Sequence, residues 1–183
     1  MAQATNIEWT DKVWNVVRGC TRVSPGCGLT DLGGCYAERM AIRQSGPGGA
    51  YEGLVKSTPH GPRWTGDIRT VPELLEQPLH WKKPVKIFVN SMSDLFHEKI
   101  PFEFIDQVFA VICLTPWHTY QILTKRPKHA IAYWQWRKEH YEKAIWPKNA
   151  WMGVSVESAD YLWRLDELSK IPAAVRFVSA EPL

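Results

Sequence analysis

Short apolar segments alternate with amphipathic segments along most of this chain. Each apolar segment spans about five residues, is rich in β-branched and aromatic side chains and ends in polar residues, as buried strands do. These predicted strands are residues 86–90, 120–124, 151–155 and 175–179, with 14–18 as a weaker first strand. Helical spacing of apolar residues, with Pro101 and Ser158 at two of the expected starts, predicts helices over 101–112, 127–141 and 158–169.

Strands joined by helices of this length cannot pair as hairpins, so the alternation predicts a parallel sheet with right-handed crossovers. A complete eight-stranded barrel needs about 250 residues, more than the 183 present. We therefore expect an α/β fold: a partial (β/α) barrel of about five parallel strands, forming one domain over 1–183, either open or part of a longer protein. Residues 44–84, dense in glycine and proline, predict a long excursion with a small hairpin near 64–69.

Composition narrows the class of protein. No stretch approaches the roughly 18 apolar residues of a membrane helix, so no membrane partner is expected. The first residues lack a basic start followed by an apolar run, so we expect a cytoplasmic protein. In a reducing compartment, clustered cysteines favour metal binding or catalysis over disulfides.

Three cysteines, Cys20, Cys27 and Cys35, fall between the first strand and a predicted helix. Three thiolates can hold three irons of a four-iron, four-sulfur cluster and leave the fourth iron open. Zinc would need a fourth protein ligand and usually short C-x2-C pairs, which this segment lacks. The spacing alone leaves a metal site and unliganded thiols equally open. Cys113, in an apolar helical stretch, is predicted to lie in the core.

Polar side chains follow four predicted strands. Because the carboxyl ends of parallel strands meet at one edge of a sheet, we expect these groups to surround a ligand site. They are Ser91, Ser93, Asp94, Lys125, Arg126, Ser155, Glu157, Ser179 and Glu181.

Simpler structural roles compete with ligand binding at these strand ends. Asp94 can cap the loop that leads into the next helix, and Glu157 can form an ion pair with Arg126 or Lys125. The adjacent His97 and Glu98 favour surface or capping roles.

Several motifs, taken in order, resemble one family. "TNIEWTDKVWNVVRGCTRVSPGC", "IFVNSMSDLFHEKIP", "QILTKRP", "WMGVSVES" and "RFVSAEPL" resemble the phage gene product thirty-seven / sixty-eight family, which occurs in phages and bacteria. That family looks like a divergent relative of the radical S-adenosylmethionine (SAM) enzymes. The resemblance implies that Cys20, Cys27 and Cys35 ligate a [4Fe-4S] cluster whose open iron binds SAM. It also implies an electron donor as a partner and a host-cell cytoplasmic location.

Two features depart from that family pattern. Its last two cysteines are commonly two residues apart, whereas residues 28–34, "GLTDLGG", separate them here. Glycines in this insertion allow it to fold out and still bring both sulfurs together. Family members also continue past "AEPL" to a Gly-Gly-Glu segment, which is not present, so a truncated or inactive protein is one expectation.

Residues 120–148 form a basic segment, with seven lysines and arginines against two glutamates. This local excess of positive charge is larger than the net charge of +3 of the whole chain. Tyr133 and Trp136 interleave with these cations, a pattern found in nucleic-acid-binding proteins and also in core-facing helices. Two hypotheses follow. One is a radical SAM-type enzyme with an unknown substrate, such as a nucleic acid or modified base. The other is a non-catalytic binding or regulatory protein that keeps the barrel shell and contacts nucleic acid or a protein through this basic helix.

Overall fold

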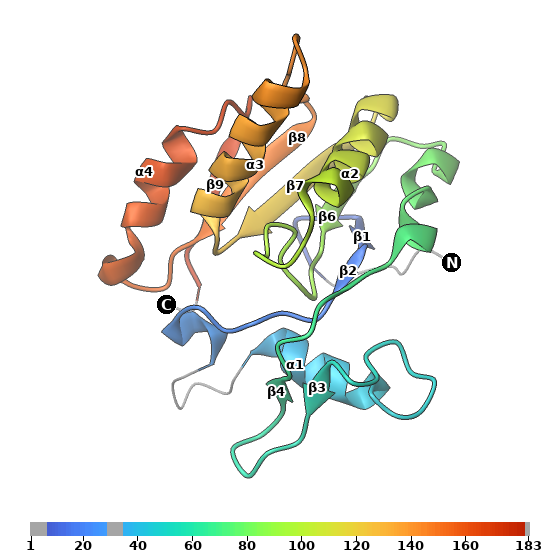
Figure 1. Ribbon diagram of the computed structural model, residues 1–183, viewed down its shortest axis with the longest axis vertical. Coiled ribbons are helices and arrows are strands. Elements are labelled where there is room, and N and C mark those ends of the chain that lie inside the picture. Colours follow the sequence, from blue (N-terminus) through green and yellow to red (C-terminus); the bar gives the residue numbers. More distant parts are fainter. Residues whose placement is uncertain (1–6, 29–34, 182–183) are drawn as a thin grey trace.

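A five-stranded parallel sheet forms the centre of the computed structural model, which describes residues 7–28 and 35–181. The strands lie in the order β1-β6-β7-β8-β9 (Figure 1). Their bounds are β1 (Lys12–Trp14), β6 (Lys86–Val89), β7 (Thr119–Thr124), β8 (Ala150–Ser155) and β9 (Arg176–Ser179). Every neighbouring pair is parallel. The predicted α/β class with a partial (β/α) arrangement of five strands is confirmed.

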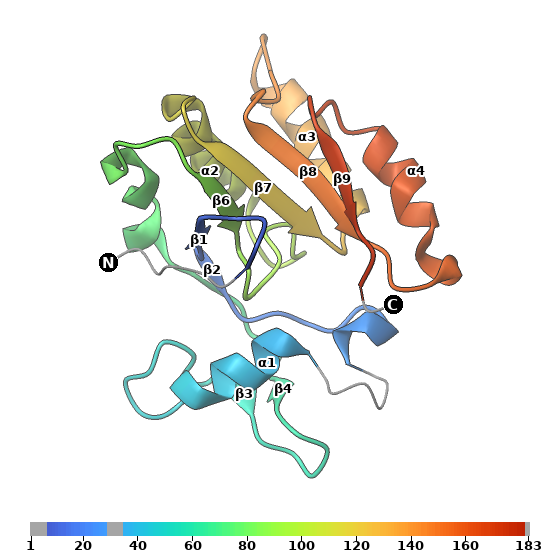
Figure 2. The ribbon, with the colours of Figure 1, turned by 180° about the vertical axis from the view of Figure 1, so that it is seen from behind.

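Three helices cover one face of this sheet, while the opposite face is visible from behind (Figures 1 and 2). They are α2 (Phe102–Leu114), α3 (Pro127–His140) and α4 (Trp163–Ser169). Fully buried apolar side chains of α2, including Ile105 and Phe109, join those of the strands, including Ile122 and Met152, in one core. The predicted helices are confirmed because apolar residues at helical spacing have a sheet to cover.

Prolines mark the starts of two helices as the sequence predicts, whereas Ser158 does not mark the start of α4. Pro101 is the N-cap of α2, and α3 begins at Pro127, where a missing N–H costs nothing. Ser158 precedes a 3-10 turn, η5 (Ala159–Tyr161), and α4 begins only at Trp163. The predicted 158–169 helix is therefore a 3-10 turn followed by an α-helix.

The first sheet strand lies earlier in the chain than predicted. β1 pairs with β6 and ends at Trp14. The expected strand 14–18 divides, because β2 (Val17–Arg18) leaves the sheet and pairs antiparallel with β5 (Arg69–Thr70). Its Val17 N–H donates to the side chain of Asn90, 3.1 Å away, so it is satisfied outside the parallel sheet.

Residues 35–70 form what we call the accessory lobe, which lies beyond the carboxyl ends of the sheet strands (Figure 1). It contains α1 (Tyr36–Ala41), η2 (Ile42–Gln44) and the hairpin of β3 (Val55–Lys56) with β4 (Arg63–Trp64). A second apolar cluster fills it, made of Ala41, Tyr51, Leu54, Val55, Trp64 and Met92. The remaining short turns are η1 (Pro25–Cys27), η3 (Pro72–Leu74) and η4 (Gln77–His80).

The hairpin predicted near 64–69 is wrong. Trp64 pairs back with Val55, whereas Arg69 pairs with Arg18 in a different two-stranded sheet. Gly66, at φ +95°, turns the chain between the two pairings, a backbone conformation that favours glycine.

Cys113 is exposed, so its predicted place in the core is also wrong. The buried stripe of α2 includes Ile105, Val108 and Ile112, and Cys113 lies off that stripe. Among the described residues, no helix is long and apolar enough to cross a membrane.

Candidate functional site

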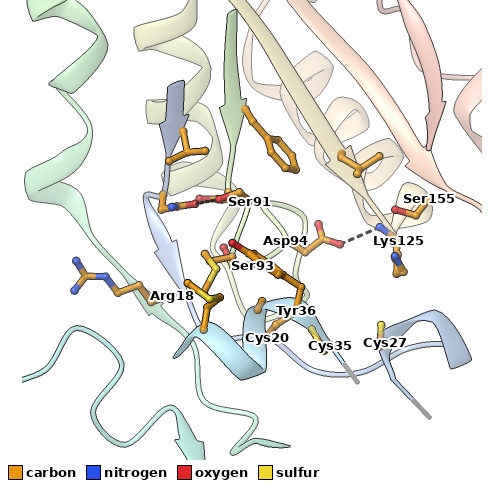
Figure 3. Close-up of a pocket in the computed structure, with 18 of the residues that line it drawn as sticks. Arg18, Cys20, Cys27, Cys35, Tyr36, Ser91, Ser93, Asp94, Lys125 and Ser155 are labelled. Carbon is orange, nitrogen blue, oxygen red and sulfur yellow. Dashed lines mark hydrogen bonds between the residues drawn. The ribbon is translucent and has the colours of Figure 1, made fainter. Parts of the chain in front are cut away.

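The carboxyl ends of the sheet strands, the segment after β2 and helix α1 enclose an open cavity of about 1350 Å³ (Figure 3). This is the edge of the sheet where α/β proteins bind ligands, and the volume exceeds the usual 300–1,000 Å³ or so of ligand pockets. Nearly all the predicted site residues line it: Cys20, Cys27, Cys35, Ser91, Ser93, Asp94, Lys125, Arg126, Ser155, Ser179 and Glu181. Glu157 is the predicted site residue that does not.

The three cysteines lie along one side of this cavity, and the strand-end residues Ser93 and Asp94 lie on the other (Figure 3). Cys20 follows β2, Cys27 ends η1 and Cys35 is the N-cap residue of α1. All three are half-buried free thiols. In the part of the chain that the structure describes, no group of three or more His, Cys, Asp or Glu side chains is arranged to hold a metal. Within the 28–34 insertion, positions 29–34 lie outside the described residues.

An ion pair joins the segment that carries Cys27 to the helix that follows Cys35. The guanidinium of Arg22 contacts both carboxylate oxygens of Glu38, and its Nη1 donates to the carbonyl of Gly28 at 2.8 Å. Glu38 Oε1 also accepts from the backbone N–H of Trp64 at 3.0 Å. Arg22 and Glu38 therefore fix two cysteine-bearing segments to the accessory lobe. Sequence reasoning missed them, because 16 positions separate the partners.

Arg126 lies behind Cys20, and all its side-chain nitrogens have partners within the protein. Nε donates to Glu98 at 2.9 Å, and Nη1 lies 3.3 Å from Asp94 Oδ2 and 3.8 Å from Cys20 Sγ. Nη2 donates to the carbonyl of Thr21 at 2.9 Å. Arg126 thus links the Cys20 segment to the ends of β6 and β7. Burial raises the pKa of the Cys20 thiol to about 12, although the charge of Arg126 lowers it.

Asp94 joins the ends of the two central strands. Its Oδ1 accepts from the hydroxyl of Thr124 at 2.7 Å and from the N–H of Phe96 at 3.0 Å. Its Oδ2 accepts from the N–H of Lys125, also at 3.0 Å (Figure 3). Asp94 therefore caps a turn within the loop before α2, whereas the N-cap of α2 itself is Pro101. This carboxylate also places negative charge beside the start of α3, where it offsets the cations that would oppose the helix dipole.

The remaining strand-end residues differ in how free they are to meet a ligand. Ser91 Oγ donates to Asn15 Oδ1 at 3.2 Å, and Ser93 Oγ donates to the carbonyl of Val17 at 2.8 Å. Lys125 is half-buried in the cavity wall and forms no ion pair with any described residue. Lys125 is thus the predicted strand-end cation that remains for an anionic ligand.

Asn90 adds a polar group that sequence reasoning did not select. It lines the cavity, and its Nδ2 is buried without a hydrogen-bond partner among the described residues. Such an unpaired buried donor costs free energy unless a ligand or water accepts from it. Its position directly after a buried strand is the sequence feature that could have identified Asn90 as a cavity residue.

Glu157 supports the cysteine wall from outside the cavity. Its Oε2 forms a buried ion pair with Arg164 Nη1 at 2.7 Å, so the predicted pairing with Lys125 or Arg126 is wrong. Arg164 Nη1 also donates to the carbonyl of Ser155 at 2.8 Å. Gly26, next to Cys27, packs so closely on Glu157 that a Cβ there would lie 3.0 Å from Glu157 Cβ.

Of the predicted surface or capping roles, His97 has the capping one and is buried, while the side chain of Glu98 is more than half exposed. The Nδ1 atom of His97 accepts from the N–H of Lys99, which leaves Nε2–H to donate to Thr21 Oγ1 at 2.9 Å. Burial lowers the pKa of His97 to about 4, with Arg126 acting in the same direction. A neutral His97 therefore holds the residue after Cys20.

Comparisons with known proteins add one finding. A family model described as "Protein of unknown function (DUF5131)" matches residues 4–183, which include the sheet, the accessory lobe and all three cavity cysteines. Neither the curated proteins nor the solved structures contain a match to this chain.

Proposed function

This chain belongs to the DUF5131 family of proteins of unknown function, and we propose that it is an iron–sulfur protein of the radical SAM type. In this proposal Cys20, Cys27 and Cys35 hold a [4Fe-4S] cluster, and the strand ends opposite them bind SAM. One observation carries the proposal: three free thiols from three separate segments line the same cavity at the carboxyl edge of a parallel sheet.

The donor set suits such a cluster. Thiolates are soft ligands that favour iron–sulfur chemistry, and three of them leave one iron available for a further ligand. The network around Arg126 would hold the Cys20 segment in place, and the Arg22–Glu38 pair would hold the segments of Cys27 and Cys35. Metal sites rely on such supporting contacts for ligand orientation.

The opposite side of the cavity suits a ligand with both a carboxylate and an amino group. Lys125 would pair with the carboxylate, and the exposed Glu181 with the amino group. The unpaired Nδ2 of Asn90 and the hydroxyl of Ser155 would donate to further acceptor atoms. When bound, the cluster supplies one electron from a donor partner, and SAM supplies the carbon–sulfur bond whose cleavage gives a radical.

Anaerobic reconstitution with iron and sulfide tests the cluster. We expect a brown protein with visible thiolate-to-iron charge-transfer absorbance and about four iron atoms per chain. Cys20→Ala, Cys27→Ala and Cys35→Ala should each lose most of this iron and colour. Cys113→Ala is the matched control, because Cys113 is exposed and outside the cavity, and it should retain both.

The other outcomes separate the alternatives. A colourless wild-type protein without iron would refute the proposal and leave the non-catalytic binding protein. Stoichiometric zinc that depends on the same cysteines would identify a structural zinc site instead.

Lys125→Ala tests the SAM side of the cavity separately. By calorimetry it should weaken SAM binding about tenfold, the loss expected for one charge-assisted hydrogen bond, while iron content stays at the wild-type value. Unchanged SAM affinity would remove Lys125 from the proposed site.

A further inference from the structure

The accessory lobe carries an excess of positive charge that no ion pair among the described residues neutralises. Residues 35–70 contain three carboxylates and five cationic side chains, which are Arg39, Arg43, Lys56, Arg63 and Arg69. The structure pairs none of these five cations with a carboxylate of the described residues; Glu38, the one lobe carboxylate in an ion pair, is bound by Arg22 from outside the lobe. Unpaired cations gathered on one lobe are typical of surfaces that bind phosphate groups.

Helix α1 and the turn after it arrange part of this charge as a stripe that leads out of the cavity. Tyr36, Arg39 and Arg43 recur at helical spacing and are exposed. Tyr36 and Arg39 also line the cavity, whereas Arg43 lies further along the chain and outside the lining. An aromatic ring therefore lies at the cavity wall, with two guanidinium groups following it on the same face.

The cavity has room and aromatic surface for a base. Its volume of about 1350 Å³ exceeds the pocket size typical for one small ligand. Trp9 and Phe88 also line it, with ring centroids 4.7 Å apart, and Tyr36 is 58% exposed. Flat aromatic side chains beside cations are the combination that binds unpaired nucleotides.

The predicted basic helix, α3, is less suited to binding nucleic acid than the accessory lobe. On α3, Arg137 pairs with Asp106 at 2.8 Å, and Lys128 lies 5.0 Å from the centre of the Trp163 ring. Arg126 is buried within its own network. Lys143 and Lys148 precede β8, so they lie at the amino edge of the sheet, opposite the cavity. The contact with nucleic acid predicted for this helix is better placed on the accessory lobe.

We propose that single-stranded nucleic acid binds along the Tyr36–Arg39–Arg43 stripe, with its phosphates on the arginines and one base stacked on Tyr36 at the cavity. This names the substrate class of the site described above. As a substrate assignment it rests on the proposed function, whereas the binding itself requires neither iron nor SAM.

Fluorescence anisotropy with a labelled single-stranded oligonucleotide tests this surface on the iron-free full chain. Arg39→Glu/Arg43→Glu should weaken binding at least about tenfold, and Arg39→Gln/Arg43→Gln should reduce the slope of log K against log salt by about 1.4, for two lost phosphate contacts. Lys143→Glu/Lys148→Glu is the matched control, because it changes the charge equally at exposed positions, and it should bind within about twofold of the wild type.

Tyr36→Ala tests the stacking contact, and we expect about a tenfold loss of affinity with an unchanged salt slope. The nucleic-acid proposal is refuted if the oligonucleotide does not bind, or if both charge-reversal pairs weaken binding equally. It is also refuted if polyglutamate binds more tightly with the same dependence on Arg39 and Arg43, since that would identify an acidic protein partner.

Iron content measured on the same preparations keeps the two proposals apart. A protein that takes up no iron but binds the oligonucleotide through Arg39 and Arg43 would retain this inference and refute the cluster. A protein that takes up iron but does not bind the oligonucleotide would retain the cluster proposal and refute this inference.

Discussion

At Asn90 the chain leaves β6 in a left-handed conformation, with φ +58°. Asparagine tolerates this region better than most residues other than glycine. Its side chain then accepts from the N–H of Val17, and its own N–H donates to the carbonyl of Trp14 at 2.9 Å. One residue thus ends a central strand, holds β2 away from the sheet and presents a side chain to the cavity.

Two substitutions separate these roles of Asn90. Asn90→Ala loses the hydrogen bond and keeps the strained φ, whereas Asn90→Gly loses the same bond and relieves the strain. We expect both variants to be less stable than the wild type, with the alanine variant lower by about 1 kcal/mol. Urea denaturation measures the difference. Equal stability of the two variants would show that the left-handed backbone costs nothing here.

At the scale of elements, buried ion pairs fix the turns and helices that surround the cavity. Arg164 of α4 and Glu157 after β8 have side chains only 1% and 2% exposed. The Arg164 guanidinium also lies 4.4 Å from the centre of the Tyr161 ring. Because Gly26 packs on Glu157, this pair connects α4 and β8 to the turn that carries Cys27.

Breaking this pair from one side should be costly. Arg164→Met leaves a buried carboxylate without its partner and should lower the free energy of unfolding by about 3–5 kcal/mol. Arg164→Met/Glu157→Gln should recover part of that loss, because the uncompensated charge is gone. Lys170→Met is a control in the same region. Lys170 forms an ion pair with Glu167, but its side chain is 57% exposed, so the loss of this pair should lower the free energy of unfolding by only about 0–1 kcal/mol. Additive effects in the double variant would mean that the two side chains act independently.

At the scale of the whole molecule, three histidines are held neutral by burial. His97, His118 and His129 all have pKa values below the ordinary value for histidine, with desolvation as the largest cause. Since the unfolded chain takes up protons at higher pH than the folded one, these groups contribute full stability above about pH 6.5. That contribution falls as the pH drops below this value.

The pH dependence of unfolding tests this. For His97, whose pKa is lowered to about 4, lowering the pH from 7.5 to 5 should cost about 2 kcal/mol of stability. His97→Gln should reduce that dependence, whereas replacing the exposed His60 by glutamine should leave it unchanged. Urea denaturation at both pH values measures the effect, and a flat profile for the wild type would contradict the neutral, buried state of His97.

Local pattern determined much of this protein. Apolar runs such as 120–124 and the helical spacing of 101–112 predicted the parallel sheet and its helices, because burial of one face dictates sequence periodicity. Most strand-end groups then gather at one edge, since parallel strands share a direction. The three cysteines line the same cavity because their segment follows the first strand, as predicted. The [4Fe-4S] cluster and SAM remain predictions.

Tertiary structure alone decided which partners the polar groups take. Arg126 lies against Asp94 and Glu98, Glu157 pairs with Arg164, and Arg22 reaches Glu38. Such choices depend on which charges become buried together, and burial is a property of the packed chain that local sequence does not encode. The same holds for the cations of the accessory lobe, because only the packed chain shows that none of them forms an ion pair with another described residue.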